Sequence, residues 1–130
     1  MSHHRETVTA AGAPKAAGPY SHAIKHNGVV YLSGQTPIDP DTGSLVEGSI
    51  GDQARRVLDN LTIVAEAAGA KLQDAVRIGI YVTDISTFKD VNEAYGTYFT
   101  DGPPARSTIG VAALPLGAQV EIDAVLAVPD

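Results

Sequence analysis

The spacing of apolar residues changes along this chain from a period of two to a period of about 3.6 and back, and this order restricts the fold. Alternating segments predict strands over 21–25, 29–33, 76–83, 106–111 and 119–128. One helical stripe begins after Ser49, a possible N-cap, and ends at Gly69. A second begins at Asp84 or Ser86 and ends at the Asp-Gly-Pro-Pro run over 101–104. The order strands, helix, strand, helix, strands predicts an α+β fold with two helices packed on a sheet.

Turn-forming residues join the predicted strands. Asn27 and Gly28 lie between the first two strands, and an Asn-Gly pair supplies the positive φ angles of a type I′ hairpin turn. The preceding segment 10–19 is rich in Ala, Gly and Pro, which predicts an ordered loop rather than a helix. A second hairpin, centred near Leu116, is predicted between the last two strands.

Two segments, 29–32 and 124–128, are apolar on both faces, as is typical of buried strands. A chain of 130 residues predicts one domain over 1–130, and its two helices can cover only one face of a sheet of five or six strands. Because the chain has no further element for the other face, we expect a second copy of the chain to cover it. The sequence therefore predicts a homo-oligomer with sites where subunits meet.

The composition excludes several classes of function. The chain has no cysteine, which removes disulfides, thiolate nucleophiles and thiolate zinc sites. Its net charge is −6 and its basic residues are scattered except for Arg55 and Arg56, so nucleic acid is not an expected partner. No segment reaches the ~18 apolar residues of a membrane span, and the N-terminus leads into no signal-peptide core. We therefore expect a soluble, cytoplasmic protein with no membrane partner.

The sequence contains no phosphate loop, dinucleotide fingerprint, metalloprotease helix or nucleophile elbow. Among the polar residues that remain, Arg106 is the first candidate for chemistry. It follows a stiff Pro-Pro-Ala run and opens a strand with apolar neighbours. A guanidinium at such a position would be partly desolvated and able to bind a carboxylate through two N–H groups. A structural salt bridge is the alternative interpretation.

Glu121 is the second candidate, because it faces the side of its strand opposite to Val120 and Ile122. Across the predicted second hairpin, Arg106 and Thr108 would lie within a few residues of it. A glutamate screened from water can transfer protons near neutral pH, and one close to an arginine stays charged and can orient a water molecule. A solvated strand face is the alternative interpretation.

Other polar residues give weaker signals. Tyr20 follows Gly-Pro, and Ser33 with Gly34 lies at a strand end, so these groups can add hydrogen-bond donors, although each alone is often structural. His22 and His26 flank the first turn, but no third ligand is spaced to join them. The sequence therefore predicts no metal site.

Five motifs together resemble the reactive intermediate deaminase family, RidA, also called YjgF-like. They span nearly the whole chain: Gly-Pro-Tyr-Ser at 18–21, Leu-Ser-Gly-Gln at 32–35, Val-Asn-Glu-Ala-Tyr at 91–95, Pro-Ala-Arg-Ser-Thr at 104–108 and Val-Glu-Ile-Asp-Ala at 120–124. The resemblance implies a chorismate-mutase-like fold, with a mixed sheet and two helices on one face. It also implies a homotrimer whose sheets turn inward and which has clefts between its subunits.

The resemblance further implies a hydrolase acting on C=N bonds, of the 2-iminobutanoate/2-iminopropanoate deaminase type. Its substrates would be small 2-imino acids and enamines such as 2-iminopropionate and 2-aminoacrylate, and its products 2-keto acids and ammonia. No cofactor is expected, because an iminium carbon is already a strong electrophile. The alternative is a non-catalytic protein that binds a small carboxylate, such as a keto acid, in the same inter-subunit cleft.

Position by position, Arg106 matches the family's arginine that holds the substrate carboxylate, and Glu121 matches the acidic residue associated with water activation. The residues that match those lining the cleft are Tyr20, Ser33, Gly34 through its backbone, and Asn92. Thr108 stands where many relatives carry cysteine. Hydrolysis by an activated water molecule needs no thiol, and the Thr108 hydroxyl can bond that water or the imine nitrogen. A thiol-based redox role for this chain is placed in doubt by the threonine.

Overall fold

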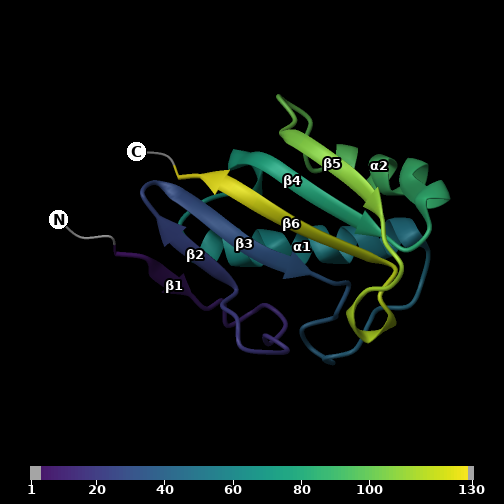
Figure 1. Ribbon diagram of the computed structural model, residues 1–130, viewed down its shortest axis with the longest axis horizontal. Coiled ribbons are helices and arrows are strands. Elements are labelled where there is room, and N and C mark those ends of the chain that lie inside the picture. The colour runs from purple at the N-terminus through teal and green to yellow at the C-terminus, as the bar shows by residue number, and fades with distance from the viewer. Residues whose placement is uncertain (1–3, 129–130) are drawn as a thin grey trace.

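The computed structural model describes residues 4–128, which form a six-stranded sheet in the order β1-β2-β3-β6-β4-β5 together with two α-helices (Figure 1). The strands are β1 (Glu6–Val8), β2 (Ala23–His26), β3 (Val29–Gln35), β4 (Ala75–Val82), β5 (Ala105–Gly110) and β6 (Val120–Ala127). The helices are α1 (Ile50–Ala67) and α2 (Phe88–Gly96), with short 3-10 turns at Leu72–Asp74, Ile85–Thr87 and Pro115–Gly117.

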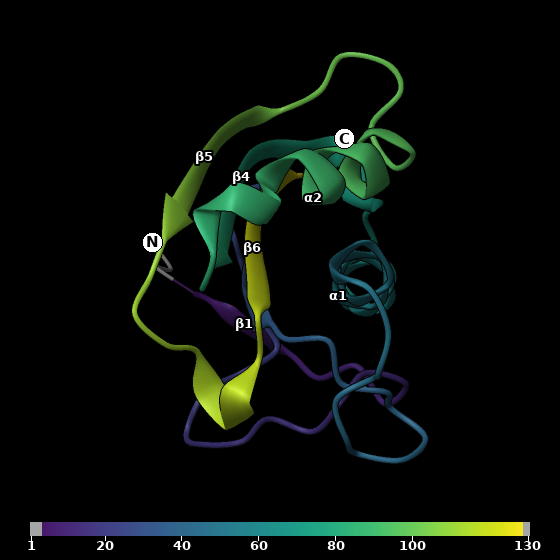
Figure 2. The same cartoon turned by 90° about the vertical axis from the view of Figure 1, so that its right-hand side faces the viewer.

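Both helices lie on the same side of the sheet, which Figure 2 shows edge on. The core lies between these layers, where the α1 stripe of Val57, Leu58 and Leu61 is fully buried. The predicted α+β fold with two helices on one face is confirmed. Within residues 4–128, neither helix combines the length and the apolar character that crossing a membrane requires.

Two local predictions are also confirmed. Asn27 and Gly28 take φ angles of 51° and 76°, and they join β2 and β3 as an antiparallel hairpin. Ser49 caps α1, because its side-chain oxygen accepts a hydrogen bond from the backbone N–H of Asp52 at 3.1 Å. The second helix is shorter than predicted, since α2 ends at Gly96.

The second predicted hairpin is wrong. β5 pairs with β4 in parallel, and β6 lies between β3 and β4 and is antiparallel to both. The core face of β6 is fully buried at Val120, Ile122 and Leu126, whereas Ile109 and Gly110 of β5 are exposed. The more apolar strand therefore takes the central position, where neighbours on both sides bury it, and β5 forms the edge.

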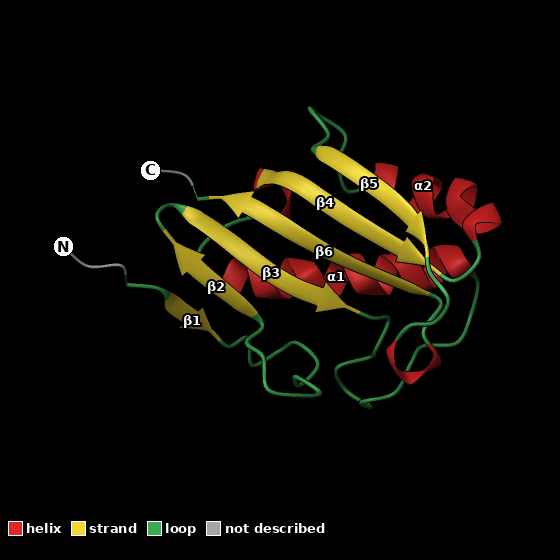
Figure 3. Cartoon of the chain, viewed as in Figure 1, coloured by secondary structure: helices red, strands yellow, loops and turns green. Residues whose placement is uncertain are grey.

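The sheet face turned away from the helices is open in this chain (Figure 3). Tyr31 on β3 and Ile109 on β5 are each 48% exposed on it. Arg77, Tyr81 and Asp123 share the same face, with Tyr81 donating a hydrogen bond to Asp123 at 3.1 Å. Within residues 4–128, no helix covers this mixed apolar and polar surface.

Candidate active site

Two pockets contain the residues predicted for the site, except Thr108, which lines neither of them. The first, which we call the Glu121 pocket, has a volume of about 310 Å³ and lies between the end of β3, the start of β6 and the loops that contain residues 14–20, 36–38 and 115–116. Its lining includes Lys15, Tyr20, Ser33, Gly34, Leu116 and Glu121. The second, which we call the Arg106 pocket, has a volume of about 360 Å³ and lies between α2 and the start of β5. Its lining includes Asn92, Tyr95, Phe99, Pro103, Pro104 and Arg106.

The position of Glu121 follows from the alternation of β6. Val120 and Ile122 are fully buried under the helices, so the Glu121 side chain points to the open face. There it crosses directly over Gly34 of β3: a Cβ on Gly34 would lie 2.9 Å from the Glu121 Cδ and closer still to Oε2. Only glycine at this position leaves room for the carboxyl group.

The environment of Glu121 favours its protonated form. Partial burial raises the pKa of the Glu121 carboxyl above its ordinary value, and the neighbouring negative charge of Asp123 raises it further. A carboxyl with a raised pKa binds and releases a proton closer to neutral pH than an exposed glutamate does. The Glu121 pocket therefore contains a group suited to proton transfer.

His22 holds one wall of the Glu121 pocket. Its Nδ1 accepts a hydrogen bond from the Ala10 N–H at 3.0 Å, and its Nε2 donates to the Pro14 carbonyl at 2.8 Å. Because an amide can only donate and a carbonyl can only accept, these bonds define the neutral tautomer with the proton on Nε2. Both ring nitrogens are engaged in holding the 10–20 loop that carries Tyr20, so His22 has no nitrogen for a metal.

Tyr20 itself is tied into this loop, and Ser33 joins the loop to β3. The Tyr20 hydroxyl oxygen accepts a hydrogen bond from the Ala17 N–H at 3.0 Å. Ser33 donates from its hydroxyl to the Ser21 carbonyl at 2.7 Å and from its backbone N–H to the His22 carbonyl at 3.0 Å. The Tyr20 ring is therefore presented at the pocket from a loop with several anchors.

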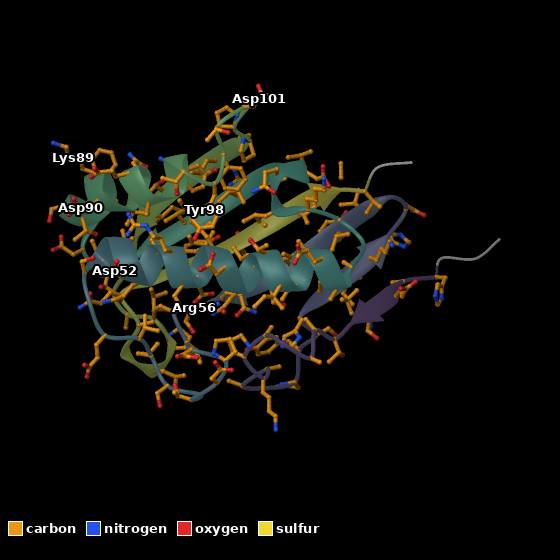
Figure 4. All side chains as sticks on the ribbon, turned by 180° about the vertical axis from the view of Figure 1, so that it is seen from behind. Asp52, Arg56, Lys89, Asp90, Tyr98 and Asp101 are labelled. Atoms are coloured by element: carbon orange, nitrogen blue, oxygen red, sulfur yellow. The ribbon has the colours of Figure 1, made fainter. Side chains whose placement is uncertain are left out.

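Asn60 holds the opposite wall. This fully buried α1 side chain donates hydrogen bonds to the backbone carbonyls of Thr36 at 3.3 Å and Ile38 at 2.9 Å. Its Oδ1 accepts a hydrogen bond from Nε of Arg56 at 3.1 Å, one turn earlier on α1 (Figure 4). The amide thus connects the helix layer to the segment that leaves β3 beside Glu121.

Arg106 lies on the other side of the sheet. It pairs with Ile78, a fully buried residue of β4, so its side chain leaves β5 toward the helix layer. The guanidinium carbon lies 4.8 Å from the centroid of the Tyr95 ring. Within residues 4–128, no carboxylate forms an ion pair with Arg106. The alternative of a structural salt bridge thus has no partner in the described part of the chain.

Two buried hydroxyl groups flank this pocket. Thr108 lies two residues beyond Arg106 on the same face of β5, beside the fully buried Ile80. Among the described residues, neither the Thr108 hydroxyl nor the Tyr95 hydroxyl has a hydrogen-bond partner. A buried polar group without a partner is costly, so the Thr108 hydroxyl is a candidate to bind a ligand, water or another chain.

The structure therefore divides the predicted site into two. Tyr20, Ser33, Gly34 and Glu121 share one pocket, whereas Asn92 and Arg106 share the other. The expectation that Arg106 lies close to Glu121 within one chain is wrong. The strand β4 separates β5 from β6, and the two side chains leave opposite faces of the sheet. In residues 4–128, no three His, Asp or Glu side chains are grouped to hold a metal ion.

The family model described as Endoribonuclease L-PSP matches residues 10–128, which include both pockets. The chain belongs to the endoribonuclease L-PSP family.

Relatives of this L-PSP family chain include proteins named as deaminases. It is 46% identical over 121 residues to Reactive Intermediate Deaminase A, chloroplastic, of Arabidopsis thaliana, covering 93% of this chain and 65% of the plant protein. It is 40% identical over 121 residues to 2-iminobutanoate/2-iminopropanoate deaminase of Mus musculus, covering 93% of this chain and 90% of the mouse protein. The crystal structure of RidA from the Antarctic bacterium Psychrobacter sp. matches with a TM-score of 0.91 and 41% identity, covering 95% and 99% of the two chains. The resemblance to the RidA family is confirmed.

Sequence reasoning missed three residues that build the two pockets of this L-PSP family protein. Asn60 interrupts the buried stripe of α1, and a polar residue on an apolar helix face is a signal for a buried hydrogen-bonding role. The sequence offers His22 only as a weak metal ligand, and its hydrogen-bond partners come from a loop whose path the sequence does not reveal. Tyr95 belongs to the motif at 91–95, but the sequence does not predict its contact with Arg106, because that contact depends on how α2 packs.

Proposed function

We propose that this protein is an enamine/imine deaminase that hydrolyses small 2-imino acids, such as 2-iminopropionate and its enamine tautomer 2-aminoacrylate, to 2-keto acids and ammonia. The observation that carries the proposal is the Arg106 guanidinium, which is half-buried, stacked on Tyr95 and without an ion-pair partner in the described chain. A desolvated guanidinium with free N–H edges is suited to a planar carboxylate. The deaminase names of relatives agree with this choice.

The complete site is proposed to form between subunits of a homotrimer. One pocket supplies a guanidinium with no acidic residue in its lining, and the other supplies a carboxyl group with no arginine in its lining, so only together do they provide the acid and the guanidinium that the proposed reaction needs. The open sheet face, with Tyr31 and Ile109 exposed, offers a surface that further copies of the chain can bury. In this arrangement the Arg106 pocket of one protomer faces the Glu121 pocket of its neighbour.

The reaction then follows from the chemistry of the side chains. Arg106 binds the substrate carboxylate through two N–H groups and places the adjoining C=N carbon near a water molecule. Glu121, whose pKa is raised by burial, accepts a proton from that water as its oxygen bonds to the carbon. Glu121 then gives this proton to the carbinolamine nitrogen. The C–N bond breaks as the hydroxyl proton passes back to the Glu121 carboxylate, so the oxygen forms the keto group and ammonia leaves.

Thr108 and Asn92 complete the proposed site. The unpartnered Thr108 hydroxyl can bond the water or the imine nitrogen, and Asn92 lies in the lining of the Arg106 pocket. No metal or organic cofactor is needed by this mechanism. The iminium carbon is already electrophilic, and positioning alone can contribute ~7 kcal/mol.

The test is to generate the imine in situ with an amino-acid oxidase and to follow its disappearance with and without the protein. We expect faster imine loss with the wild-type chain and a return to the spontaneous rate with Arg106→Ala. Keto-acid binding by calorimetry without any acceleration would favour the non-catalytic binding protein instead. The family description names a ribonuclease, but the net charge of −6 supports a small substrate, and RNA cleavage is measured in parallel.

A further inference from the structure

We propose that Tyr95 is a positioning residue that holds the Arg106 guanidinium ready for the substrate carboxylate. This inference rests on the carboxylate-binding role proposed for Arg106, and it concerns a residue of α2 whose ring face lies against the Arg106 guanidinium. Its basis is the contact between the face of the Tyr95 ring and the Arg106 guanidinium, which has no carboxylate partner within residues 4–128.

The Tyr95 ring is itself held in place. It is only 6% exposed, and its centroid lies 4.6 Å from that of Phe99, with the two planes tilted by 33°. A buried ring that packs against a second ring has little freedom to turn. Tyr95 therefore presents a stable surface on the side of α2 that faces the start of β5.

Arg106 lies against this surface. With Cζ 4.8 Å from the ring centroid, the guanidinium is within the range of a cation–π contact. Such a contact holds the cation through the ring face and does not use up its N–H groups, whereas a salt bridge would occupy the groups that the substrate needs. Arginine has many side-chain rotamers, so this support reduces the entropy lost when the carboxylate binds.

The charge environment of the ring agrees with this arrangement. Burial raises the pKa of the Tyr95 hydroxyl, and Arg106 opposes the rise through its positive charge and through the closeness of its side chain to the hydroxyl. Tyr95 thus stays a neutral phenol at physiological pH, and its ring attracts the cation without neutralising it. A phenolate here would form an ion pair with the guanidinium and compete with the substrate.

Three substitutions separate the ring from the hydroxyl and from a general packing role. Tyr95→Phe keeps the ring, whereas Tyr95→Leu and Tyr95→Met fill the space without an aromatic face. The matched control is Tyr98→Leu, because Tyr98 lies against α1, where its hydroxyl donates a hydrogen bond to Asp59 at 2.6 Å and lies 3.2 Å from the Arg55 carbonyl oxygen (Figure 4). This control removes an aromatic ring near α2 that does not contact Arg106.

The measurement is the Kd of 2-oxobutanoate by calorimetry on the full chain, with circular dichroism to establish that each variant is folded. We expect Tyr95→Phe and Tyr98→Leu to bind within about threefold of wild type, and the Leu and Met variants of Tyr95 to bind about tenfold more weakly. In an Arg106→Lys background, which lacks the planar guanidinium, Tyr95→Leu should add less than about threefold.

Wild-type affinity in a folded Tyr95→Leu or Tyr95→Met variant would overturn the inference. A Tyr95→Phe variant as weak as Tyr95→Leu would also overturn it, because the hydroxyl would then be the active group. Keto-acid binding requires no turnover, so the result is independent of the deaminase test. A wild-type protein that binds the keto acid but leaves imines unchanged would contradict the deaminase proposal and not this one.

Discussion

Replacing Gly34 with alanine tests whether Glu121 acts from its place above the β3 backbone. Gly34 does not have a positive φ angle, so alanine fits the backbone without strain. The new Cβ would lie 2.9 Å from the Cδ and 3.1 Å from the Cγ of Glu121, inside the 3.4 Å at which ordinary contacts begin. The glutamate is a flexible side chain at a partly open surface, so we expect it to move away while the fold is retained.

The size of the effect follows from that displacement. The Cδ must retreat by about half an ångström to reach ordinary contact, and the carboxylate oxygen must move further. Misplacing a catalytic group by about 1 Å can cost ~100-fold in rate. We therefore expect kcat/KM for imine hydrolysis to fall about 10- to 100-fold, which corresponds to ~1.4–2.7 kcal/mol of transition-state stabilisation.

The assay follows loss of an enzymatically generated imine, with thermal unfolding measured in parallel. Gly51→Ala is the matched control, because a Cβ at this α1 position meets Arg55 at 3.5 Å and nothing closer. Gly34→Ala and Glu121→Gln should not be additive, since both remove the same carboxyl group from its place. A Gly34→Ala protein as active as Gly51→Ala, or losses that multiply in the double variant, would refute the reasoning.

Four further outcomes test other parts of the site. Asp123→Asn should lower the pKa of Glu121 and move the acid limb of the pH–rate profile to lower pH; an unmoved limb would show that Asp123 does not act on Glu121. The raised pKa of Glu121 means that its ionised form destabilises the fold. Glu121→Gln should therefore be more stable than wild type at pH ~7, but equal to it below the ordinary glutamate pKa of ~4.3. Thermal unfolding at both pH values measures this difference. Thr108→Val should stabilise the fold by about 1 kcal/mol in denaturant titrations and slow imine turnover, whereas a loss of stability would mean that its hydroxyl has a partner. Asn60→Ala should cost about 2–3 kcal/mol by the same titration and weaken activity, and an unchanged midpoint would remove its anchoring role.

Local residue patterns predicted much of the fold. The Asn27-Gly28 pair, the Ser49 cap and the alternation of β6 each depend on a few neighbouring residues, and the structure bears out all three. The same alternation correctly placed Glu121 on the face opposite to Val120. Periodicity is a local property of the backbone, so it can be read without knowing the rest of the fold.

The sequence by itself determined the kinds of elements, the sides on which their residues lie and the family motifs that contain Arg106 and Glu121. Only the tertiary structure decided that β4 separates β5 from β6, which divides the predicted site between two pockets. Strand order depends on which apolar faces bury one another across long sequence separations, and no local pattern encodes that choice. The contact between Tyr95 and Arg106 is also decided by the tertiary structure alone, because it exists only once α2 has packed beside β5.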